Sequence, residues 1–270
     1  MEIGIVSDEI SPDFSVAVKH GLDWGIRRYE IRVLKTGRVP DVEESEIQTV
    51  LSLIKTNGIT VTALSPGLFK IPVSNEAEAR RQLGDVLPRT IELDARLGTK
   101  KVIVFGFQRE GEGAPADLDK VVKYLGAAAE IGQKAGIDLL VENEPGFWCD
   151  TGKNTALVLN RVGSPALKAN WDPCNAFGLD EEPFPDGYRQ IKSLIANVHV
   201  KDTRKGGLVE CVPVGEGLID WQGQLQALVE EKQVEHVTIE THCLPLIDKS
   251  RQNTETIRNI LAKIAENQLR

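Results

Sequence analysis

The sequence predicts a single (β/α)₈ barrel over residues 1–270, and two observations lead to it. Strand-like and helix-like segments alternate from end to end, and no linker, repeat or low-complexity stretch divides them. Length alone would fit either one large barrel or two smaller domains. A doubly wound open sheet is the alternative, but no Gly-x-Gly-x-x-Gly motif follows the first strand, and Gly215-Glu216-Gly217 follows a long loop.

Eight short, largely apolar runs predict the strands, in order, at residues 2–6, 28–33, 59–64, 101–106, 138–143, 167–172, 196–201 and 236–241. Continuous apolar character is expected of strands that are buried on both faces. Helical patterns fill the intervals, at about 13–21, 43–57, 76–97, 117–135, 153–162, 186–195, 220–232 and 249–267. This order predicts parallel strands joined by helices.

Glycine and proline mark the ends and breaks of these helices. In the segment 76–97, apolar positions recur on one face, which predicts one buried stripe, and Pro88 should bend or divide the helix. Four glycines each separate a helix from the next strand, where a left-handed C-terminal cap is expected: Gly25, Gly58, Gly98 and Gly136.

Two connections, 173–185 and 202–219, are longer than a barrel requires, and such loops usually bind a ligand or close over it. The second begins with Arg204, Lys205 and the pair Gly206-Gly207, at a place where barrels often bind phosphate. No helix follows at once to add its dipole. We therefore expect an unphosphorylated or carboxylate-bearing substrate.

The composition excludes several classes of partner. Hydrophobic residues make up 41% and charged residues 27% of the chain, as in ordinary globular proteins, and the net charge is −8. This acidic balance, without a strong basic patch, argues against nucleic acid and anionic membranes. No apolar run approaches a membrane span, and no secretory signal precedes the first strand. Four widely spaced cysteines without a CxxC motif favour reduced thiols. We expect a cytoplasmic protein with a small-molecule partner, and leave a homo-oligomer open.

Four of the predicted strands end in a potential metal ligand: Glu142, Asp172, His199 and Glu240. The ends of parallel barrel strands converge on one face, where active sites lie. A single acid at a strand end is more often a cap or a salt-bridge partner, but four on successive strands predict a metal site. Oxygen ligands with one imidazole suit Mn²⁺, Mg²⁺ or Co²⁺ and can also hold Zn²⁺. Three carboxylates exceed the charge of one such ion, so one of them can carry a proton, as acid–base chemistry requires.

The motifs around these residues also resemble a known family. They are Val141-Glu142-Asn143-Glu144, Trp171-Asp172-Pro173-x-Asn175, Val198-His199-Val200-Lys201-Asp202 and Ile239-Glu240-Thr241-His242. The chain resembles the xylose isomerase-like TIM barrel superfamily, and within it the sugar phosphate isomerase/epimerase group. That group includes ketose 3-epimerases, hydroxypyruvate isomerases and inosose dehydratases. Ser7-Asp8-Glu9-Ile10 and Tyr29-Glu30-Ile31-Arg32 are similar to its first two strands.

The resemblance implies a role for each of the four residues. In ketose epimerases of this family, residues matching Glu142, Asp172, His199 and Glu240 hold one ion of the Mn²⁺ type. The residues matching Glu142 and Glu240 exchange protons with the substrate from opposite sides. The chemistry is consistent with this, because a proton beside a ketone is only weakly acidic and a metal ion on the carbonyl oxygen stabilises the enediolate.

The chain departs from the family pattern at two places. Asn175 stands where many relatives have a histidine, and Phe105-Gly106-Phe107-Gln108 ends the fourth strand, where many have another. The related apurinic endonucleases need several histidines for three zinc ions. This chain has only four, of which His20 and His236 lie away from the strand ends, so a nuclease is not expected.

Five further residues are candidates for substrate binding: Lys201, Glu216, His242, Asn175 and Arg32. Lys201 and His242 each share a pleat face with a predicted ligand, although a buried ion pair and a structural histidine are equal alternatives. Arg32 could bind an anionic group. Glu216, between two glycines, suits either a ligand contact or a plain turn. Glu144 is expected to support Glu142.

Aromatic residues could wall a sugar pocket. Trp148 and Phe107 are candidates for that role, whereas core packing is expected of Trp171. Together these features predict a metal-dependent isomerase or epimerase that enolises a small keto-sugar. A lyase, such as an inosose dehydratase or an enzyme that eliminates from a keto-glycoside, is the first alternative. A non-catalytic sugar-binding barrel is the second, but it would be expected to lose Glu142 or Glu240.

Overall fold

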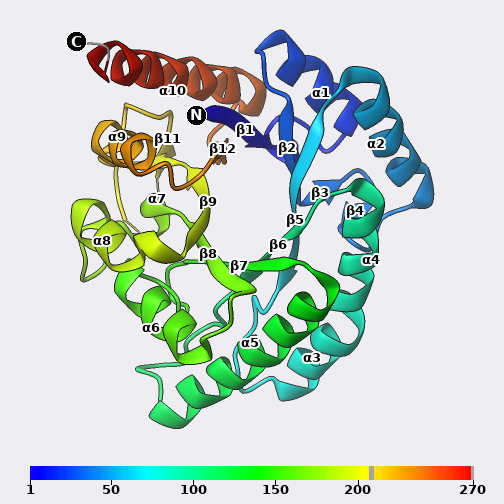
Figure 1. The fold of residues 1–270 in the computed structure, drawn as a ribbon, viewed down its shortest axis with the longest axis vertical. Coiled ribbons are helices and arrows are strands. Elements are labelled where there is room, and N and C mark those ends of the chain that lie inside the picture. Colours follow the sequence, from blue (N-terminus) through cyan, green and yellow to red (C-terminus); the bar gives the residue numbers. More distant parts are fainter. Residues whose placement is uncertain (207–209, 269–270) are drawn as a thin grey trace.

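Eight parallel strands close into a barrel in the computed structural model, which describes residues 1–206 and 210–268 (Figure 1). The ring order is β1, β12, β9, β8, β7, β6, β5, β2. Their bounds are β1 (Glu2–Val6), β2 (Arg28–Ile31), β5 (Thr60–Leu68), β6 (Lys101–Phe105), β7 (Asp138–Glu142), β8 (Leu167–Trp171), β9 (Ile195–Val200) and β12 (His236–Ile239). The predicted (β/α)₈ barrel is confirmed and the open sheet is wrong, because β1 pairs with both β2 and β12.

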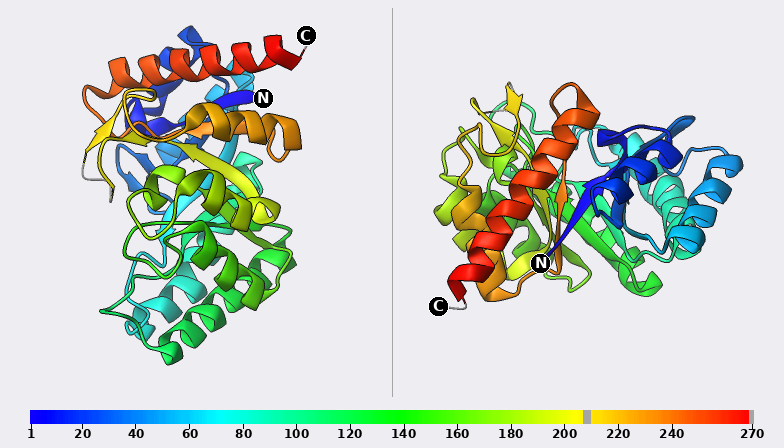
Figure 2. Two further views of the ribbon diagram at one scale, coloured as in Figure 1. Left: turned by 90° about the vertical axis from the view of Figure 1, so that its left-hand side faces the viewer. Right: turned by 90° about the horizontal axis from the view of Figure 1, so that it is seen from above.

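Helices surround the ring of strands (Figures 1 and 2). The main ones are α1 (Phe14–Asp23), α2 (Glu44–Asn57), α3 (Glu76–Arg81), α4 (Leu87–Leu97), α5 (Pro115–Ala135), α6 (Gly152–Val162), α9 (Trp221–Glu231) and α10 (Leu246–Gln268). The last of them, α10, packs against β1, β12 and α9 and so closes the ring beside the first strand. Over residues 1–206 and 210–268, the structure contains no helix with both the length and the apolar character to span a bilayer.

The helices end and break at most of the positions that the sequence predicted. Gly58, Gly98 and Gly136 are left-handed C-caps with φ of 60°, 73° and 72°, and Gly25, at 77°, follows the cap of α1. The predicted helix 76–97 is divided into α3, a π-helical turn (Gln82–Val86) and α4. Pro88 lies in the first turn of α4, where its missing N–H does no harm.

Two segments differ from the prediction. Residues 186–195 do not form one helix: α8 (Tyr188–Ile191) lies between a π-helical turn (Pro183–Gly187) and a 3₁₀ turn (Lys192–Leu194). Phe184 is extended, at φ −134° and ψ 127°, as the residue before a proline usually is, so the helical backbone is interrupted there. Strand β5 extends beyond its predicted end to Leu68, and its bulged register carries Ser65 to the barrel mouth.

Two short hairpins lie in the loops that follow the strands. One pairs β3 (Val33–Leu34) with β4 (Gly37–Arg38), and the other pairs β10 (Asp202–Thr203) with β11 (Cys211–Val212). The second belongs to the loop 202–219, and Asp202 anchors that loop because its carboxylate accepts hydrogen bonds from the backbone N–H groups of Gly215 and Ile219. A very short helix, α7 (Pro173–Ala176), follows β8.

The barrel interior is apolar only in its middle. Ile103 and Leu140 belong to a small apolar cluster that is separate from the main core between strands and helices. Two residues before each of them, Lys101 and Asp138 line a cavity at the start of the strands. Two residues after Leu140, Glu142 lines a cavity at the opposite end. Because side chains alternate along a strand, this spacing places charged groups at both ends of the barrel.

Candidate functional site

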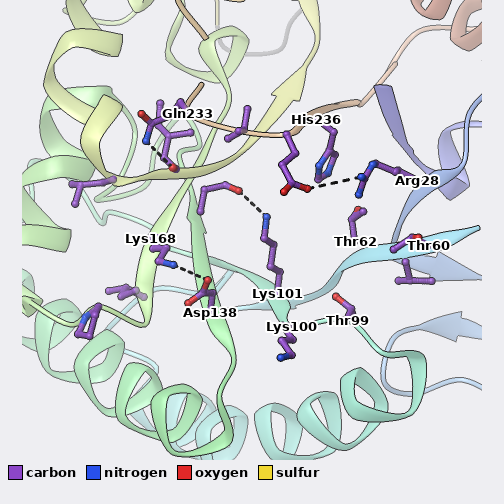
Figure 3. A pocket seen from close by; sticks show the side chains of 18 of the residues that line it. Arg28, Thr60, Thr62, Thr99, Lys100, Lys101, Asp138, Lys168, Gln233 and His236 are labelled. Atoms are coloured by element: carbon purple, nitrogen blue, oxygen red, sulfur yellow. Dashed lines mark hydrogen bonds and ion pairs between the residues drawn. The ribbon is translucent and has the colours of Figure 1, made fainter. Parts of the chain in front are cut away.

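Cavities open at both ends of the barrel. The larger, of about 780 Å³, lies at the N-terminal ends of the strands and contains none of the predicted site residues (Figure 3). The smaller, of about 60 Å³, lies at the C-terminal ends and is lined by Glu142, His199 and Glu240, among others. The residue types decide between the two cavities rather than their size, because in the described part of the chain groups of potential metal ligands converge only at the C-terminal end of the barrel.

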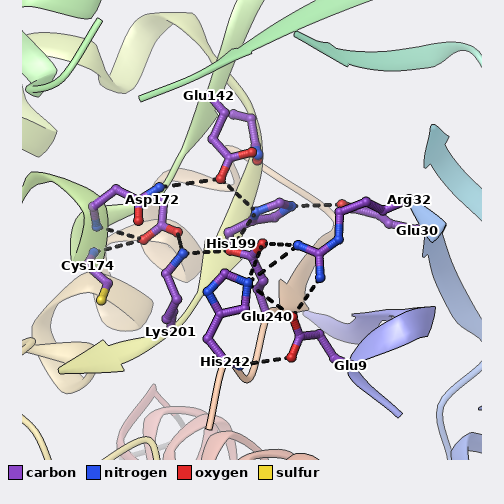
Figure 4. A network of polar contacts seen from close by, with 12 residues as sticks. Glu9, Glu30, Arg32, Glu142, Asp172, Cys174, His199, Lys201, Glu240 and His242 are labelled. Atoms are coloured by element: carbon purple, nitrogen blue, oxygen red, sulfur yellow. Dashed lines mark hydrogen bonds and ion pairs between the residues drawn. The ribbon is translucent and has the colours of Figure 1, made fainter. Parts of the chain in front are cut away.

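The four predicted ligands lie together at this smaller cavity (Figure 4). Glu142 ends β7, Asp172 follows β8, His199 lies in β9, and Glu240 follows β12. Each offers one donor atom, and these atoms all lie within 4.8 Å of one another. All four side chains are buried. Neighbouring strands of the barrel therefore deliver three carboxylates and one imidazole to a single point.

Local hydrogen bonds hold Asp172 in place. Its Oδ1 caps α7 by accepting from the N–H groups of Cys174 (2.9 Å) and Asn175 (3.1 Å). The Asn143 side chain grips the Asp172 backbone twice, since its Nδ2 donates to the carbonyl and its Oδ1 accepts from the N–H, each at 2.8 Å. Asn175 donates to the Asn143 carbonyl at 2.9 Å and reaches Glu142 Oε1 at 3.4 Å. The second oxygen of Asp172, Oδ2, is left to face the other donors.

Glu30, which sequence analysis missed, fixes the orientation of His199. Its Oε2 lies 2.7 Å from His199 Nε2, and its Oε1 accepts from Asn197 Nδ2 at 2.7 Å. The Nε2 atom therefore carries the hydrogen, and Nδ1 points to Glu142 (3.4 Å) and Glu240 (3.6 Å). Burial opposes protonation, but the carboxylates of Glu30 and Glu142 raise the pKa of His199 well above its usual value.

The donor set fits a divalent cation. Among the described residues, His199 Nδ1 and Asp172 Oδ2 are buried polar atoms without a hydrogen-bond partner, and both belong to the cluster. Buried polar atoms are rarely left unsatisfied, so their convergence points to an ion. A carboxylate behind a ligating histidine, as Glu30 lies behind His199, is also usual at metal centres.

Lys201 supplies a positive charge inside the cluster. It is 1% exposed, and its Nζ lies 2.7 Å from Glu240 Oε2 and 2.9 Å from Asp172 Oδ2, although only the Glu240 contact has the angle of a hydrogen bond. Burial opposes the charge of Lys201, but Asp172 and Glu240 raise its pKa well above the usual value. For Lys201 the sequence left two roles open, substrate binding and a buried ion pair, and the structure contains the buried ion pair.

Arg32 and His242 both contact the other oxygen of Glu240. Arg32 Nη1 donates to Glu240 Oε1 at 2.7 Å, while its Nη2 pairs with Asp8 and Glu9 at 2.8 Å each. His242 Nε2 lies 3.3 Å from the same Glu240 oxygen, and this carboxylate raises the pKa of His242 to about 10. Burial opposes ionisation of Glu240, but Lys201 and His242 hold its pKa well below the usual value.

A second group of possible ligands, Glu9, Glu240 and His242, already contains a cation. Arg32 binds Glu9 and Glu240 and lies 3.5 Å from His242 Nε2. A metal ion there would face a guanidinium. The cluster around His199 is therefore the better candidate.

Other predicted residues lie outside this cavity. Glu216 turns to Gln252 (2.8 Å) and Arg204 (3.4 Å) on the surface. Arg204 and Lys205 are exposed and lie 3.8 Å and 3.5 Å from the Glu210 carboxylate, and Gly207 lies outside the described residues. Phe107 stacks on Phe69 in the core, with ring centroids 4.6 Å apart.

The cavity wall differs from the one expected. Trp171 is core, as predicted, and donates to Gln224, whereas Trp148 packs against Arg109. The aromatic residue that lines the cavity is Phe105, with the Lys70 ammonium 4.3 Å above its ring. Glu144 holds this lysine in an ion pair of 2.7 Å.

Arg38, which sequence analysis also missed, lies on the rim of the cavity. Its Nη1 donates to the Ser65 carbonyl at 3.0 Å, and it makes no ion pair within the described residues. The only feature of the sequence that pointed to Arg38 was its place in the short segment after the second strand.

For Glu30, the feature that could have been noticed was a lone carboxylate inside a buried strand, because burying a carboxylate is costly unless it has a partner.

With this geometry in view, comparison with known proteins places the fold. A family model described as xylose isomerase-like TIM barrel matches residues 18–263. The chain belongs to the xylose isomerase-like TIM barrel family. No curated protein matches the chain in sequence.

Solved structures agree with this barrel over nearly its whole length. L-ribulose 3-epimerase has 21% identity and a TM-score of 0.79, with 99% of this chain and 97% of that chain covered. The IOLI protein with a zinc atom has 16% identity and a TM-score of 0.80, with 99% of each chain covered. The probable 3-DHS dehydratase AsbF from Bacillus anthracis has 16% identity and a TM-score of 0.78, with 96% and 99% covered. Likeness at this level of identity shows the fold alone.

Proposed function

We propose that the protein is a divalent-metal-dependent isomerase or epimerase that acts on a small keto-sugar or sugar derivative through an enediolate. The observation that carries the proposal is the position of two buried glutamates. Glu142 on β7 and Glu240 after β12 are three strands apart in a ring of eight, yet both contribute to one donor cluster. A ketose bound between them would meet carboxylates on two sides.

Glu142, Asp172, His199 and Glu240 are the residues that would hold the ion. A divalent ion there would draw charge from the carbonyl of a ketose and from the adjacent hydroxyl, which makes the neighbouring C–H more acidic. Neighbours whose structures contain a zinc atom or magnesium support this class of cofactor for the family. The donor set suits Mn²⁺, Mg²⁺ or Co²⁺ equally well.

The two glutamates have different surroundings, which suggests different tasks. Glu142 makes no ion pair with a lysine or arginine in residues 1–206 and 210–268, and its closest polar contacts are Asn175 and His199, at 3.4 Å each. We assign proton removal to Glu142. Glu240, held as a carboxylate by Arg32, Lys201 and His242, is a weak base until a bound substrate rearranges these contacts.

This asymmetry also supports the lyase alternative. The Glu240 carboxylate raises the pKa of His242, which favours its protonated form, so His242 can give a proton to a departing hydroxyl once Glu142 has taken one. A dehydratase and an epimerase are both among the structural neighbours. The same first step, proton removal by Glu142, therefore leads either to isomerisation or to loss of water.

Space and charge limit the substrate. A volume of about 60 Å³ holds about two water molecules. A sugar therefore needs the exposed Lys70 and Arg38 side chains to swing outward. Arg38, without an ion pair among the described residues, is suited to bind a carboxylate on the incoming molecule.

Proton exchange in D₂O tests the proposal. Metal-loaded protein incubated with a panel of ketoses and inososes should incorporate deuterium next to the carbonyl, and NMR of the product separates epimerisation from loss of water. Glu142→Gln should abolish exchange while substrate affinity stays within about tenfold. Glu144→Gln, two residues away on the cavity rim, is the matched control and should keep most of the proton exchange. Exchange at the wild-type rate in both Glu142→Gln and Glu240→Gln would refute the mechanism.

A further inference from the structure

The N-terminal end of the barrel contains a cavity of about 780 Å³, which is much larger than the one of about 60 Å³ at the candidate metal centre (Figure 3). Bulky branched side chains usually fill a barrel at this level. Here the inward positions near the strand starts carry charged or polar residues instead: Arg28, Thr62, Lys101, Asp138, Lys168 and His236. The wall of the cavity therefore combines these charged and polar groups with apolar residues such as Leu167 and Ile195.

Among the partly buried charged groups that line this cavity, Lys101 is the one without an ion pair in the described residues. Its Nζ donates to the Ala196 carbonyl at 2.9 Å, and no carboxylate lies within ion-pair distance among the described residues. Burial lowers the pKa of Lys101, so its environment does not favour the charge. One carbonyl uses one of three N–H donors. The remaining two have no protein partner in the described part of the chain.

The other partly buried charged groups around Lys101 are in ion pairs. Lys168 pairs with Asp138 at 2.7 Å, and Arg28 pairs with Glu2 and, at 3.9 Å, with Glu235. Each of these three carboxylates thus has another cation as its ion-pair partner. Lys100, on the rim, is exposed and also makes no ion pair within residues 1–206 and 210–268.

One more buried polar atom at this cavity, His236 Nε2, has no partner among the described residues, and the His236 side chain is 5% exposed. A Cβ at the neighbouring Gly4 would come within 3.2 Å of the Arg28 carbonyl oxygen and 3.4 Å of His236 Cδ2, so the ring lies directly against the first strand. An unsatisfied buried ring nitrogen beside an ammonium group that has no ion pair in the described residues favours a ligand in this cavity.

We propose that this cavity is a second binding site, for a small organic anion whose phosphate or carboxylate group lies on the ammonium of Lys101. Four lysine or arginine side chains line it against two carboxylates, in a chain whose net charge is −8. The volume exceeds that of an oxyanion alone and leaves room for an organic part. The site lies at the opposite end of the barrel from the candidate metal centre and does not depend on it.

Imidazole NMR locates the site without any variant. The chain has four histidines, so ¹⁵N–¹H spectra can follow each ring while inorganic phosphate or glycerol 3-phosphate is added. The His236 resonances should shift and saturate, because His236 lines the cavity, while those of His20 should not move. Glycerol 3-phosphate should saturate them at a lower concentration than inorganic phosphate. An unmoved His236, or shifts confined to His199 and His242, would overturn the proposal.

Calorimetry with the same two probes tests the role of Lys101. Lys101→Met keeps the length of the side chain and should weaken binding at least about tenfold, since a charge-assisted contact is lost. Lys100→Gln, on the rim, should weaken it by about twofold to fivefold at low salt and serves if Lys101→Met does not fold. Lys123→Gln, on the exposed face of α5, makes the same charge change away from the cavity and should bind as wild type. Wild-type affinity in Lys101→Met or, where that variant does not fold, in Lys100→Gln contradicts the proposal.

Discussion

Replacement of Glu30 by glutamine should weaken metal binding, although Glu30 does not belong to the donor cluster. In the wild type, one Glu30 oxygen accepts from His199 Nε2 and the other from Asn197 Nδ2, each at 2.7 Å. A glutamine has only one accepting oxygen, so its NH₂ group must face one of these donors. The variant therefore loses one charge-assisted hydrogen bond, worth about 1.5–3 kcal/mol. It also no longer holds His199 Nδ1 firmly toward Glu142 and Glu240.

We expect the Mn²⁺ or Co²⁺ affinity of Glu30→Gln to fall by about tenfold to hundredfold, in line with other residues behind metal-ligating histidines. Isothermal titration calorimetry at fixed pH measures this directly. Glu144→Gln removes a carboxylate of the same type from the cavity rim, but Glu144 pairs with Lys70 and does not touch His199, so this control should stay within about threefold. Unchanged affinity in Glu30→Gln, or an equal loss in Glu144→Gln, would refute the reasoning.

Three further predictions concern charge. Lys201→Met removes the buried ion-pair partner of Asp172 and Glu240. Urea unfolding should show that the metal-free variant is less stable than the wild type by about 3–5 kcal/mol, and Mn²⁺ should restore part of this loss. If the variant and the wild type are equally stable in a chelator, the pairing is contradicted. Burial lowers the pKa of His236 from 6.5 to about 4, so the unfolded state binds more protons between these values, and stability should fall by roughly 3 kcal/mol as pH drops from 6.5 to 4. His236→Asn should remove this fall in stability between pH 6.5 and 4, and an unchanged dependence on pH would contradict the lowered pKa of His236. A hydrogen bond with Cys174, and a further one with His242, lower the pKa of the half-buried Cys211 to about 5. Iodoacetamide at about pH 6 should therefore label Cys211 before the other cysteines, and peptide mass spectrometry measures the order of labelling. Faster labelling of Cys243 would show that the Cys211 thiol is not activated.

The sequence predicted the barrel and the four convergent donors because both follow from position along a strand. A buried parallel strand is a continuous apolar run, and a polar residue at its end must point into the mouth of the barrel. The partners of those donors could not be predicted in the same way. Glu30 supports His199 across 169 positions of sequence, and that pairing depends on the closed ring and on the register between strands.

Arg32 illustrates the same limit. Its place at the end of the second strand suggested an anion-binding residue. Only the fold shows that Asp8, Glu9 and Glu240 already surround its guanidinium. Glu216 is a second example, because its place between two glycines did not indicate that its carboxylate would turn toward Gln252 on the surface. Charge pairing between distant segments is a property of the assembled barrel.

Anomalous diffraction from crystals grown with Mn²⁺ tests the central claim most directly. The account predicts one strong manganese peak at the C-terminal mouth of the barrel, with one atom each from Glu142, Asp172, His199 and Glu240 at about 2.0–2.4 Å. His199 should bind through Nδ1, because Glu30 occupies Nε2. A peak between Glu9, Glu240 and His242, or no peak within reach of His199 at saturating Mn²⁺, would contradict it.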